Sequence, residues 1–281
     1  MDTVRSQKIR MASEYLYKEE YGDGDPILCL HGLGANIFTW RYFIEPFSRK
    51  NKLILIDLKG FGSSAKPDDE RYSIHDHADA IHELIQKNDW RTLTLIGNSY
   101  GGALALLLAM RIEESDPSRL SKLVLLDAGA YREYLPAYLK LMRTFLGMPM
   151  IFLLPARQTA KFVLNLSFYD SGKISEEQVS AYAGPLADPG TRNSLLQTAR
   201  LCIPSDADEL VAKYKTISVP TLILWGRHDH IVPLKVGELL SQALPSSVLE
   251  VLEECGHVPQ EEQPQKTIAR ISEFLRLDLP Q

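Results

Sequence analysis

The sequence predicts an α/β protein with a mostly parallel, doubly wound sheet that is interrupted by an inserted helical segment. Two features predict this class. Short apolar runs alternate with longer helix-like segments along most of the chain, and this alternation stops between residues 130 and 218. Strands that alternate with helices form parallel sheets covered by helices on both faces.

Six apolar runs have the length and composition of buried strands. In chain order they span residues 27–30, 53–58, 93–96, 123–126, 221–225 and 248–252. Helix-like segments span residues 73–87, 101–114, 236–244 and 265–275. The weakly alternating segment 14–21 ends at Gly22-Asp23-Gly24, which predicts an antiparallel strand that turns into the first buried strand.

Residues 130–218 contain no convincing buried strand, only apolar helical pieces broken by prolines and glycines. An inserted helical subdomain is the simplest explanation. The predicted organisation is therefore a core made of residues 1–129 and 219–281, with residues 130–218 inserted between its two parts.

The composition is that of an ordinary globular protein. Hydrophobic residues make up 45% and charged residues 24% of the 281 positions, and the net charge of −5 offers no basic balance for a nucleic-acid partner. We expect no membrane span, because the most apolar window, residues 145–156, is too short and contains two prolines. The N-terminal segment lacks the apolar core of a signal peptide. Three separated cysteines without a CxxC pair indicate a reducing, cytoplasmic location, and the oligomeric state stays open.

The stretch LTLIGNSYGGALALLLAMR, residues 93–111, places Ser99 between a predicted strand and a predicted helix. An abrupt strand-to-helix turn puts its apex residue in a strained backbone conformation and brings the flanking residues close together. Gly97 and Gly101 remove the side chains that would collide there. Such a turn lifts the Ser99 hydroxyl above the sheet at the positive end of the following helix. The Tyr100 N–H then has no helical partner and can bind a developing oxyanion.

A serine nucleophile needs a base and an acid that orients the base. The sequence offers Asp229 just after one predicted strand and His257 just after the next. The resulting chain order of Ser, Asp and His is the one expected for a nucleophile on this type of turn. Asp127, which ends the predicted strand 123–126, is the alternative for the acid role, because triads are defined by geometry and not by sequence position.

A second oxyanion donor is expected from the loop after the first buried strand. The Leu33 N–H is the best candidate, because Gly32 and Gly34 allow a tight turn around it. We interpret His31 as a structural residue that hydrogen-bonds to the backbone of this loop.

Five motifs, taken together, resemble those of the α/β-hydrolase superfamily. They are HGLG at 31–34, DLKGFGSS at 57–64, GNSYGG at 97–102, GRHDHIVP at 226–233 and CGHVPQEEQP at 255–264. The resemblance extends from about residue 13 to the C-terminus, except for the insertion.

The resemblance implies a role for each candidate residue. Ser99 looks like the nucleophile, His257 like the general base and Asp229 like the acid. The amides of Leu33 and Tyr100 would form the oxyanion hole. The insertion would be the helical cap that covers the site in this superfamily. No metal and no organic cofactor is required by this chemistry.

Two other motifs favour different chemistry but have structural explanations. His75-Asp76-His77-Ala78-Asp79 resembles part of a binuclear metal site, yet Ala80 stands where the last histidine is required. The same segment suits a helix start with Ser73 as the N-cap and Asp76 three residues later. Residues 60–65, GFGSSA, match a dinucleotide fingerprint, but no helix opens directly after them.

Three further residues near the candidate site are interpreted as structural. His228 and His230 flank Asp229 and are expected to be loop residues and not metal ligands. Cys255 is expected to be a small buried hydrophobic residue.

The insertion is rich in methionine and other apolar side chains. They either pack the insertion on the core or line an adaptable pocket for an acyl or alkyl chain. They are Leu139, Leu141, Met142, Phe145, Leu146, Met148, Met150, Ile151, Phe152, Leu153 and Leu154.

These observations predict a serine hydrolase that acts on a small-molecule ester, or a related carbonyl compound, with a mainly apolar group, through an acyl-enzyme. The alternative in the same superfamily is a carbon–carbon bond hydrolase of ring-cleavage products. Those enzymes commonly carry a tryptophan directly after the catalytic histidine, where this chain has Val258, and an arginine in the cap. Arg143, Arg157 and Arg192 are candidates for that arginine. A ligand-binding receptor with slight turnover is the third possibility.

Overall fold

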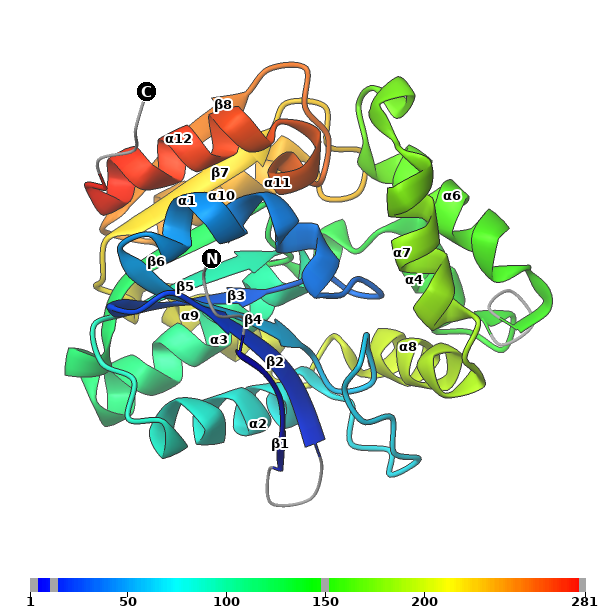
Figure 1. The fold of residues 1–281 in the computed structure, drawn as a ribbon, viewed down its shortest axis with the longest axis horizontal. Coiled ribbons are helices and arrows are strands. Elements are labelled where there is room, and N and C mark those ends of the chain that lie inside the picture. Colours follow the sequence, from blue (N-terminus) through cyan, green and yellow to red (C-terminus); the bar gives the residue numbers. More distant parts are fainter. Residues whose placement is uncertain (1–4, 11–14, 148–151, 278–281) are drawn as a thin grey trace.

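A computed structural model describes residues 5–10, 15–147 and 152–277. Its centre is an eight-stranded sheet with helices on both faces (Figure 1). Across the sheet the strands are β1 (Arg5–Arg10), β2 (Tyr15–Tyr21), β4 (Asn51–Asp57), β3 (Asp25–Leu30), β5 (Leu93–Asn98), β6 (Leu120–Leu126), β7 (Thr221–Gly226) and β8 (Ser247–Leu252). The strands from β4 to β8 are parallel, and β1 and β2 are antiparallel to their neighbours. The predicted fold class is confirmed.

The pairing of β2 corrects one expectation. The segment is an antiparallel strand, but it pairs with β4 and does not form a hairpin with β3. The physical reason is burial, because strands covered on both faces are apolar throughout and occupy the centre of the sheet. β4 satisfies that condition, whereas β2 carries Lys18 and Glu20 and lies nearer the edge. The edge strand β1 was not predicted, since RSQKIR contains a single apolar residue.

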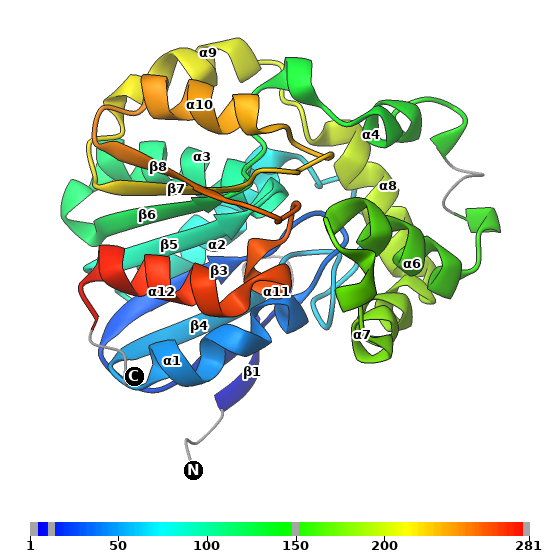
Figure 2. The same cartoon turned by 90° about the horizontal axis from the view of Figure 1, so that it is seen from above.

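Alternate residues of the central strands face opposite sides of the sheet, so two hydrophobic cores form. Leu95 of β5 belongs to the core beneath α2 (Ile74–Lys87), α3 (Tyr100–Ser115) and α10 (Leu234–Ala243). The next residue, Ile96, belongs to the core beneath α1 (Ile44–Ser48) and α12 (Pro264–Leu275). Figure 2 shows these helices on the two sides of the sheet.

The predicted helices form with ends shifted by one or two residues. α2 begins with the expected capping box, in which Ser73 and Asp76 bond to each other's backbone amides. The 3₁₀ helix η1 (Ile37–Phe43) and α1 were not predicted, because they are short and lie between two strongly apolar strands.

The segment between β6 and β7 is helical, and its described residues contain no strand. Its helices are α4 (Ala137–Met142), α6 (Ala156–Ser167), α7 (Glu176–Leu186), α8 (Pro189–Leu201) and α9 (Ala207–Lys213). The first four lie together beyond the carboxyl ends of the strands (Figure 2). In contrast, Leu210 and Val211 of α9 pack against the core that contains Leu95. Tyr214 and Ile217, which follow α9, are buried in the core of the sheet.

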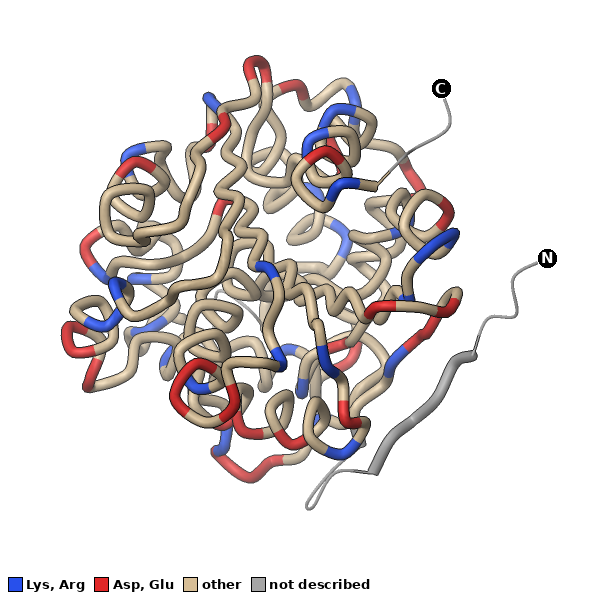
Figure 3. The backbone as a smooth tube through the Cα atoms, turned by 90° about the vertical axis from the view of Figure 1, so that its left-hand side faces the viewer, with Lys and Arg blue, Asp and Glu red and all other residues tan. Residues whose placement is uncertain are grey.

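The exposed charges are mixed in sign. Acidic and basic residues alternate along the outer helices and loops (Figure 3). Many are paired, as Arg227 is with Glu253 and Arg157 with Glu176. Within the described part of the chain, no helix combines the length and the apolar character needed to cross a membrane.

Candidate active site

Ser99 occupies the sharp turn between β5 and α3, with a φ of 56° that non-glycine residues rarely adopt. A Cβ on Gly97 would lie 2.2 Å from the carbonyl oxygen of Gly101. A Cβ on Gly101 would lie 2.1 Å from the carbonyl oxygen of Leu30 in β3. Both glycines are therefore required by backbone contacts of the turn, as the sequence predicts.

The backbone around Ser99 leaves two amides available. The Ser99 carbonyl accepts hydrogen bonds from the amides of Gly102, Ala103 and Gly129. In the described ranges, the amides of Tyr100 and Leu33 donate to no protein acceptor. The loop that carries Leu33 is pressed against the serine, since a Cβ on Gly32 would lie 3.2 Å from the Ser99 Cβ.

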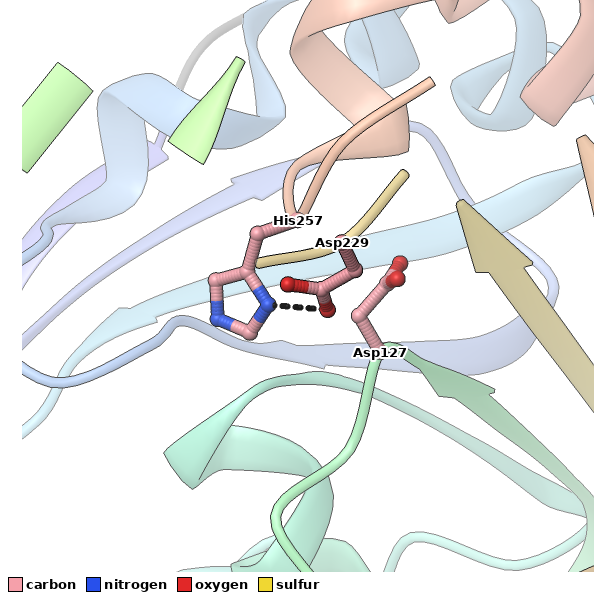
Figure 4. Close-up of side chains that lie close together, drawn as sticks. All are labelled: Asp127, Asp229 and His257. Atoms are coloured by element: carbon pink, nitrogen blue, oxygen red, sulfur yellow. Dashed lines mark hydrogen bonds and ion pairs between the residues drawn. The ribbon is translucent and has the colours of Figure 1, made fainter. Parts of the chain in front are cut away.

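His257 and Asp229 form a buried hydrogen-bonded pair (Figure 4). The His257 Nδ1 lies 2.7 Å from the Asp229 Oδ2. The Asp229 Oδ1 accepts the amides of Ile231 at 2.7 Å and Val232 at 2.9 Å, so both carboxylate oxygens are used. An ionised carboxylate in this position holds the imidazole with its proton on Nδ1 and leaves Nε2 free to accept another.

The backbone of His257 is held at both ends. Its amide donates to the carbonyl of Ser167 at the end of α6, at 2.7 Å. Its carbonyl accepts the Asn98 side-chain amide at 3.0 Å. The residue directly before the candidate nucleophile thus fixes the candidate base, a role that sequence inspection missed.

Asp127 lies beside this pair without bonding to the histidine (Figure 4). It is fully buried, and its Oδ1 accepts the Gly226 amide at 2.9 Å. Burial, and then the nearby charge of Asp229, raise the pKa of Asp127 well above its ordinary value. Of the two acids considered from the sequence, the one that hydrogen-bonds to His257 is Asp229.

A cavity of about 580 Å³ opens at this point, between the sheet and the helical segment. Ser99, His257, Leu33 and Tyr100 all line it, whereas Asp229 lies behind the histidine. No hydrogen bond joins Ser99 to His257 in the described structure. A looser contact of this kind is common before a substrate is bound.

The lining of the cavity is mostly apolar. Among the described residues that line it, Arg132 is the only arginine or lysine, and it is exposed and pairs with Asp208 at 3.0 Å. Glu261 also reaches the cavity but bonds to Arg41 at 2.7 Å.

The apolar residues of the insertion divide between wall and surface. Leu139, Met142 and Leu154 line the cavity. Leu154 is also exposed, as are Leu141, Phe145, Leu146, Phe152 and Leu153. Met148, Met150 and Ile151 lie outside the described residues.

A family model described as alpha/beta hydrolase fold matches residues 25–264, most of the chain. This chain is an α/β hydrolase. It is 27% identical over 262 residues to 2-hydroxy-6-oxo-2,4-heptadienoate hydrolase of Pseudomonas putida, covering 91% of each chain. It is 27% identical over 267 residues to Lipase 3 of a Moraxella species, covering 92% of this chain and 80% of the relative.

Solved structures show the same fold. The 2-hydroxy-6-oxo-6-phenylhexa-2,4-dienoate hydrolase of a Rhodococcus species has a TM-score of 0.82 and 24% identity, covering 98% of this chain and all of that one. A putative lipase of Acinetobacter baumannii has a TM-score of 0.81 and 23% identity, covering 97% and 91%.

Sequence inspection missed two buried glutamates of this α/β hydrolase, of which Glu262 holds the His257 loop and Glu261 joins η1 to α7. Glu262 accepts the amides of Gly256 at 2.7 Å, Asp170 at 2.8 Å and Tyr169 at 3.1 Å. The Glu261 carboxylate accepts hydrogen bonds from four side chains, those of Thr39, Arg41, Gln178 and Tyr182. Their only sequence signal is an acidic pair next to an apolar helix in CGHVPQEEQP.

The histidines of the metal-like motif bind separate partners. His77 is buried, its Nδ1 lies 2.7 Å from the Tyr100 hydroxyl, and burial lowers its pKa to about 3. The half-exposed His75 bonds to Asp206. In the described residues, the only cluster with metal-ligand spacing is Asp127, Asp229 and His257. Hydrogen bonds already occupy one atom of each of these groups, so the cluster is explained without an ion.

The structure also places the other residues considered from the sequence. His31 accepts the Leu58 amide on Nε2 and lies 2.8 Å from the Gly32 carbonyl through Nδ1, as expected for a structural residue. No helix follows residues 60–65 directly. His228 stacks on Tyr169, with ring centroids 4.4 Å apart. His230 is exposed, and Cys255 is buried.

Proposed function

We propose that this α/β hydrolase is a serine hydrolase that cleaves esters with a mainly apolar group through an acyl-enzyme. Ser99 is the nucleophile, His257 the general base and Asp229 the acid that orients it. The amides of Leu33 and Tyr100 form the oxyanion hole. The helices α4 and α6–α8 form a cap over the cavity. This cap ends before α9, so it is shorter than the predicted segment 130–218.

The reaction has two halves. The Ser99 Oγ attacks the ester carbonyl carbon while its proton passes to the His257 Nε2. The two amides hold the negative oxygen of the tetrahedral intermediate. The C–O bond to the alcohol then breaks, the departing oxygen takes the proton from His257, and an acyl-Ser99 ester remains. A water molecule, deprotonated by His257, attacks that ester and releases the acid and the free serine.

The apolar lining of the cavity is the observation that carries the choice of substrate. The dienoate substrates in the names of several relatives carry a carboxylate, which needs a cation when it is buried. The three arginines considered for that role do not line the cavity. Arg143 bonds to the carbonyls of Ala199 and Arg200, and Arg157 pairs with Glu176.

Arg192 is likewise engaged by protein acceptors. Its Nε donates to the carbonyl of Leu186, and its Nη1 donates to the carbonyls of Phe152 and Leu154. Together with Val258 after the histidine, this favours an uncharged ester over a ring-cleavage product.

The test compares hydrolysis of p-nitrophenyl esters by the wild type, by Ser99→Ala and by the control Ser180→Ala, which removes an exposed hydroxyl from α7. We expect turnover by the wild type and the control, and loss of turnover of at least roughly 10³-fold in Ser99→Ala. A fluorophosphonate should label Ser99 and inactivate the enzyme. Turnover of a 2-hydroxy-6-oxo-dienoate without ester turnover would instead establish carbon–carbon cleavage. Binding of esters without turnover would establish a receptor.

A further inference from the structure

Two sets of residues line the cavity beyond Ser99, one from α3 and the other from α6 and α7. We propose that the substrate is an ester of a linear fatty acid, whose acyl chain lies in a channel along α3 that ends at the contact between His75 and Asp206. The inference rests on the proposed function and adds the class of acid, its position and its length limit.

One wall of the channel is a single face of α3. Ala103, Leu107 and Met110 all line the cavity, and their spacing of four and then three residues places them on the same side of the helix. Because an α-helix rises 1.5 Å per residue, Met110 lies about 16 Å along the axis from Ser99. An extended chain of roughly twelve carbons has this length, since each bond advances it by about 1.3 Å.

The opposite wall is also apolar. Ile74 comes from the first turn of α2, Leu210 from α9 and Tyr214 from the segment after α9. The Tyr214 hydroxyl donates to the Ala130 carbonyl at 2.8 Å, so its polar atom is satisfied. A methylene chain that replaces water along such a wall gains free energy with each CH₂ group that it buries.

The position of His257 decides which part of the ester enters this channel. The departing alcohol must receive its proton from His257 and therefore leaves on the histidine side. That side adjoins α6, because the His257 amide bonds to Ser167 and Val258 packs against the cluster that contains Leu164. The alcohol therefore lies toward α6 and α7, and the acyl chain takes the channel along α3.

Polar residues mark the far end of the channel. Ile74, Met110 and Ala207 line it there. The residues next to them in sequence are His75, Arg111 and Asp206, and their side chains bond to one another. The His75 Nε2 lies 3.0 Å from the Asp206 Oδ1, and the Arg111 Nη2 lies 3.2 Å from the His75 Nδ1. A hydrocarbon end that reaches this group would displace hydrogen bonds, which limits the length of the chain.

The experiment varies the acyl and the alcohol parts of the ester separately. One series uses p-nitrophenyl esters of saturated acids from acetate to palmitate, and the other uses acetate esters of linear alcohols. Met110→Trp fills the far end of the channel. We expect its kcat/KM for dodecanoyl esters to fall by at least tenfold relative to butanoyl esters, while the acetate series keeps its wild-type profile. Met110→Ala should shift the optimum toward longer acids.

The matched control is Val163→Trp, at an exposed position of α6 that lines the other part of the cavity. It should alter the alcohol series and leave the acyl profile unchanged. Equal losses for short and long acyl esters in Met110→Trp, with an unchanged circular dichroism spectrum, would overturn the proposal. So would a changed acyl profile in Val163→Trp.

Calorimetric binding of free fatty acids to Ser99→Ala separates this inference from the proposed function. Affinity that rises with chain length and is cut by Met110→Trp supports the channel even if no ester is turned over. Ester turnover that depends on Ser99, without any chain-length dependence of binding or of kcat/KM, supports the proposed function and rejects the channel.

Discussion

Glu262 accepts the amide hydrogen of Gly256, the residue directly before His257, at 2.7 Å. The same carboxylate accepts two amides from the chain just after α6, so it joins the histidine loop to the helical segment. Three amide donors on one buried carboxylate hold together the backbone segments that donate to it. The position of the histidine is therefore coupled to the position of α6.

Glu262→Gln should lower kcat more than it raises KM, because it loosens the histidine loop and leaves the apolar walls intact. The glutamine NH₂ group cannot accept an amide hydrogen, so at least one buried donor loses its partner at a cost of about 1–3 kcal/mol. Steady-state kinetics and urea denaturation measure both effects. Glu254→Gln, an exposed change on the same loop, is the control and should alter neither. A Glu262→Gln variant with reduced stability but wild-type kcat would limit Glu262 to a folding role.

Asp127→Asn should leave activity within about threefold of the wild type, because His257 bonds to Asp229 and not to Asp127, and Asn preserves the acceptor for the Gly226 amide. Asp229→Asn should lower kcat by roughly 10³–10⁴-fold, because the neutral amide no longer stabilises the imidazolium form of His257. Measuring kcat of both variants with the same ester shows which of the two aspartates is the functional acid. If the two losses are reversed, Asp127 is the functional acid.

The sequence predicts the sheet well because its central strands are buried on both faces and carry uninterrupted apolar runs. β1 and η1 have no such signal, because β1 depends on its pairing with β2 and η1 depends on its packing against β4 and α12. Around the cavity, Ser99, Leu33, Tyr100 and His257 can be placed from sequence because each directly follows a buried strand or a glycine turn. The roles of Glu262 and Asn98 could not be predicted, since both act through backbone groups that only the folded chain brings near.

Gly101→Ala and Gly184→Ala should have opposite effects on stability. A Cβ on Gly101 would lie 2.1 Å from the Leu30 carbonyl oxygen, whereas a Cβ on Gly184 in α7 meets no atom within 4 Å. We expect Gly101→Ala to destabilise the fold by more than about 2 kcal/mol, as overpacked sites do. Gly184→Ala should stabilise it by about 0.5–1 kcal/mol through helix propensity. Thermal and urea unfolding measure both, and equal effects would contradict the turn geometry.

The stability of the enzyme should fall in mild acid because His77 is buried in its neutral form. Burial lowers the pKa of His77 from 6.5 to about 3, so the unfolded chain binds its proton more tightly than the folded one. The stability that this histidine contributes is fully present above pH 6.5 and is lost as the pH falls toward 3. The slope is up to about 1.4 kcal/mol per pH unit.

Urea denaturation between pH 7 and pH 5 measures this slope in the wild type and in His77→Asn. In His77→Asn, the dependence of the unfolding free energy on pH should become smaller by most of the contribution of one histidine. His31 continues to contribute, because burial lowers its pKa to about 4. His75→Asn, which removes a half-exposed imidazole from the same helix, controls for the loss of a ring. Identical slopes in the two variants would mean that the proton taken up on unfolding belongs to another group. A smaller slope in His77→Asn alone would assign it to the buried ring that holds the Tyr100 hydroxyl.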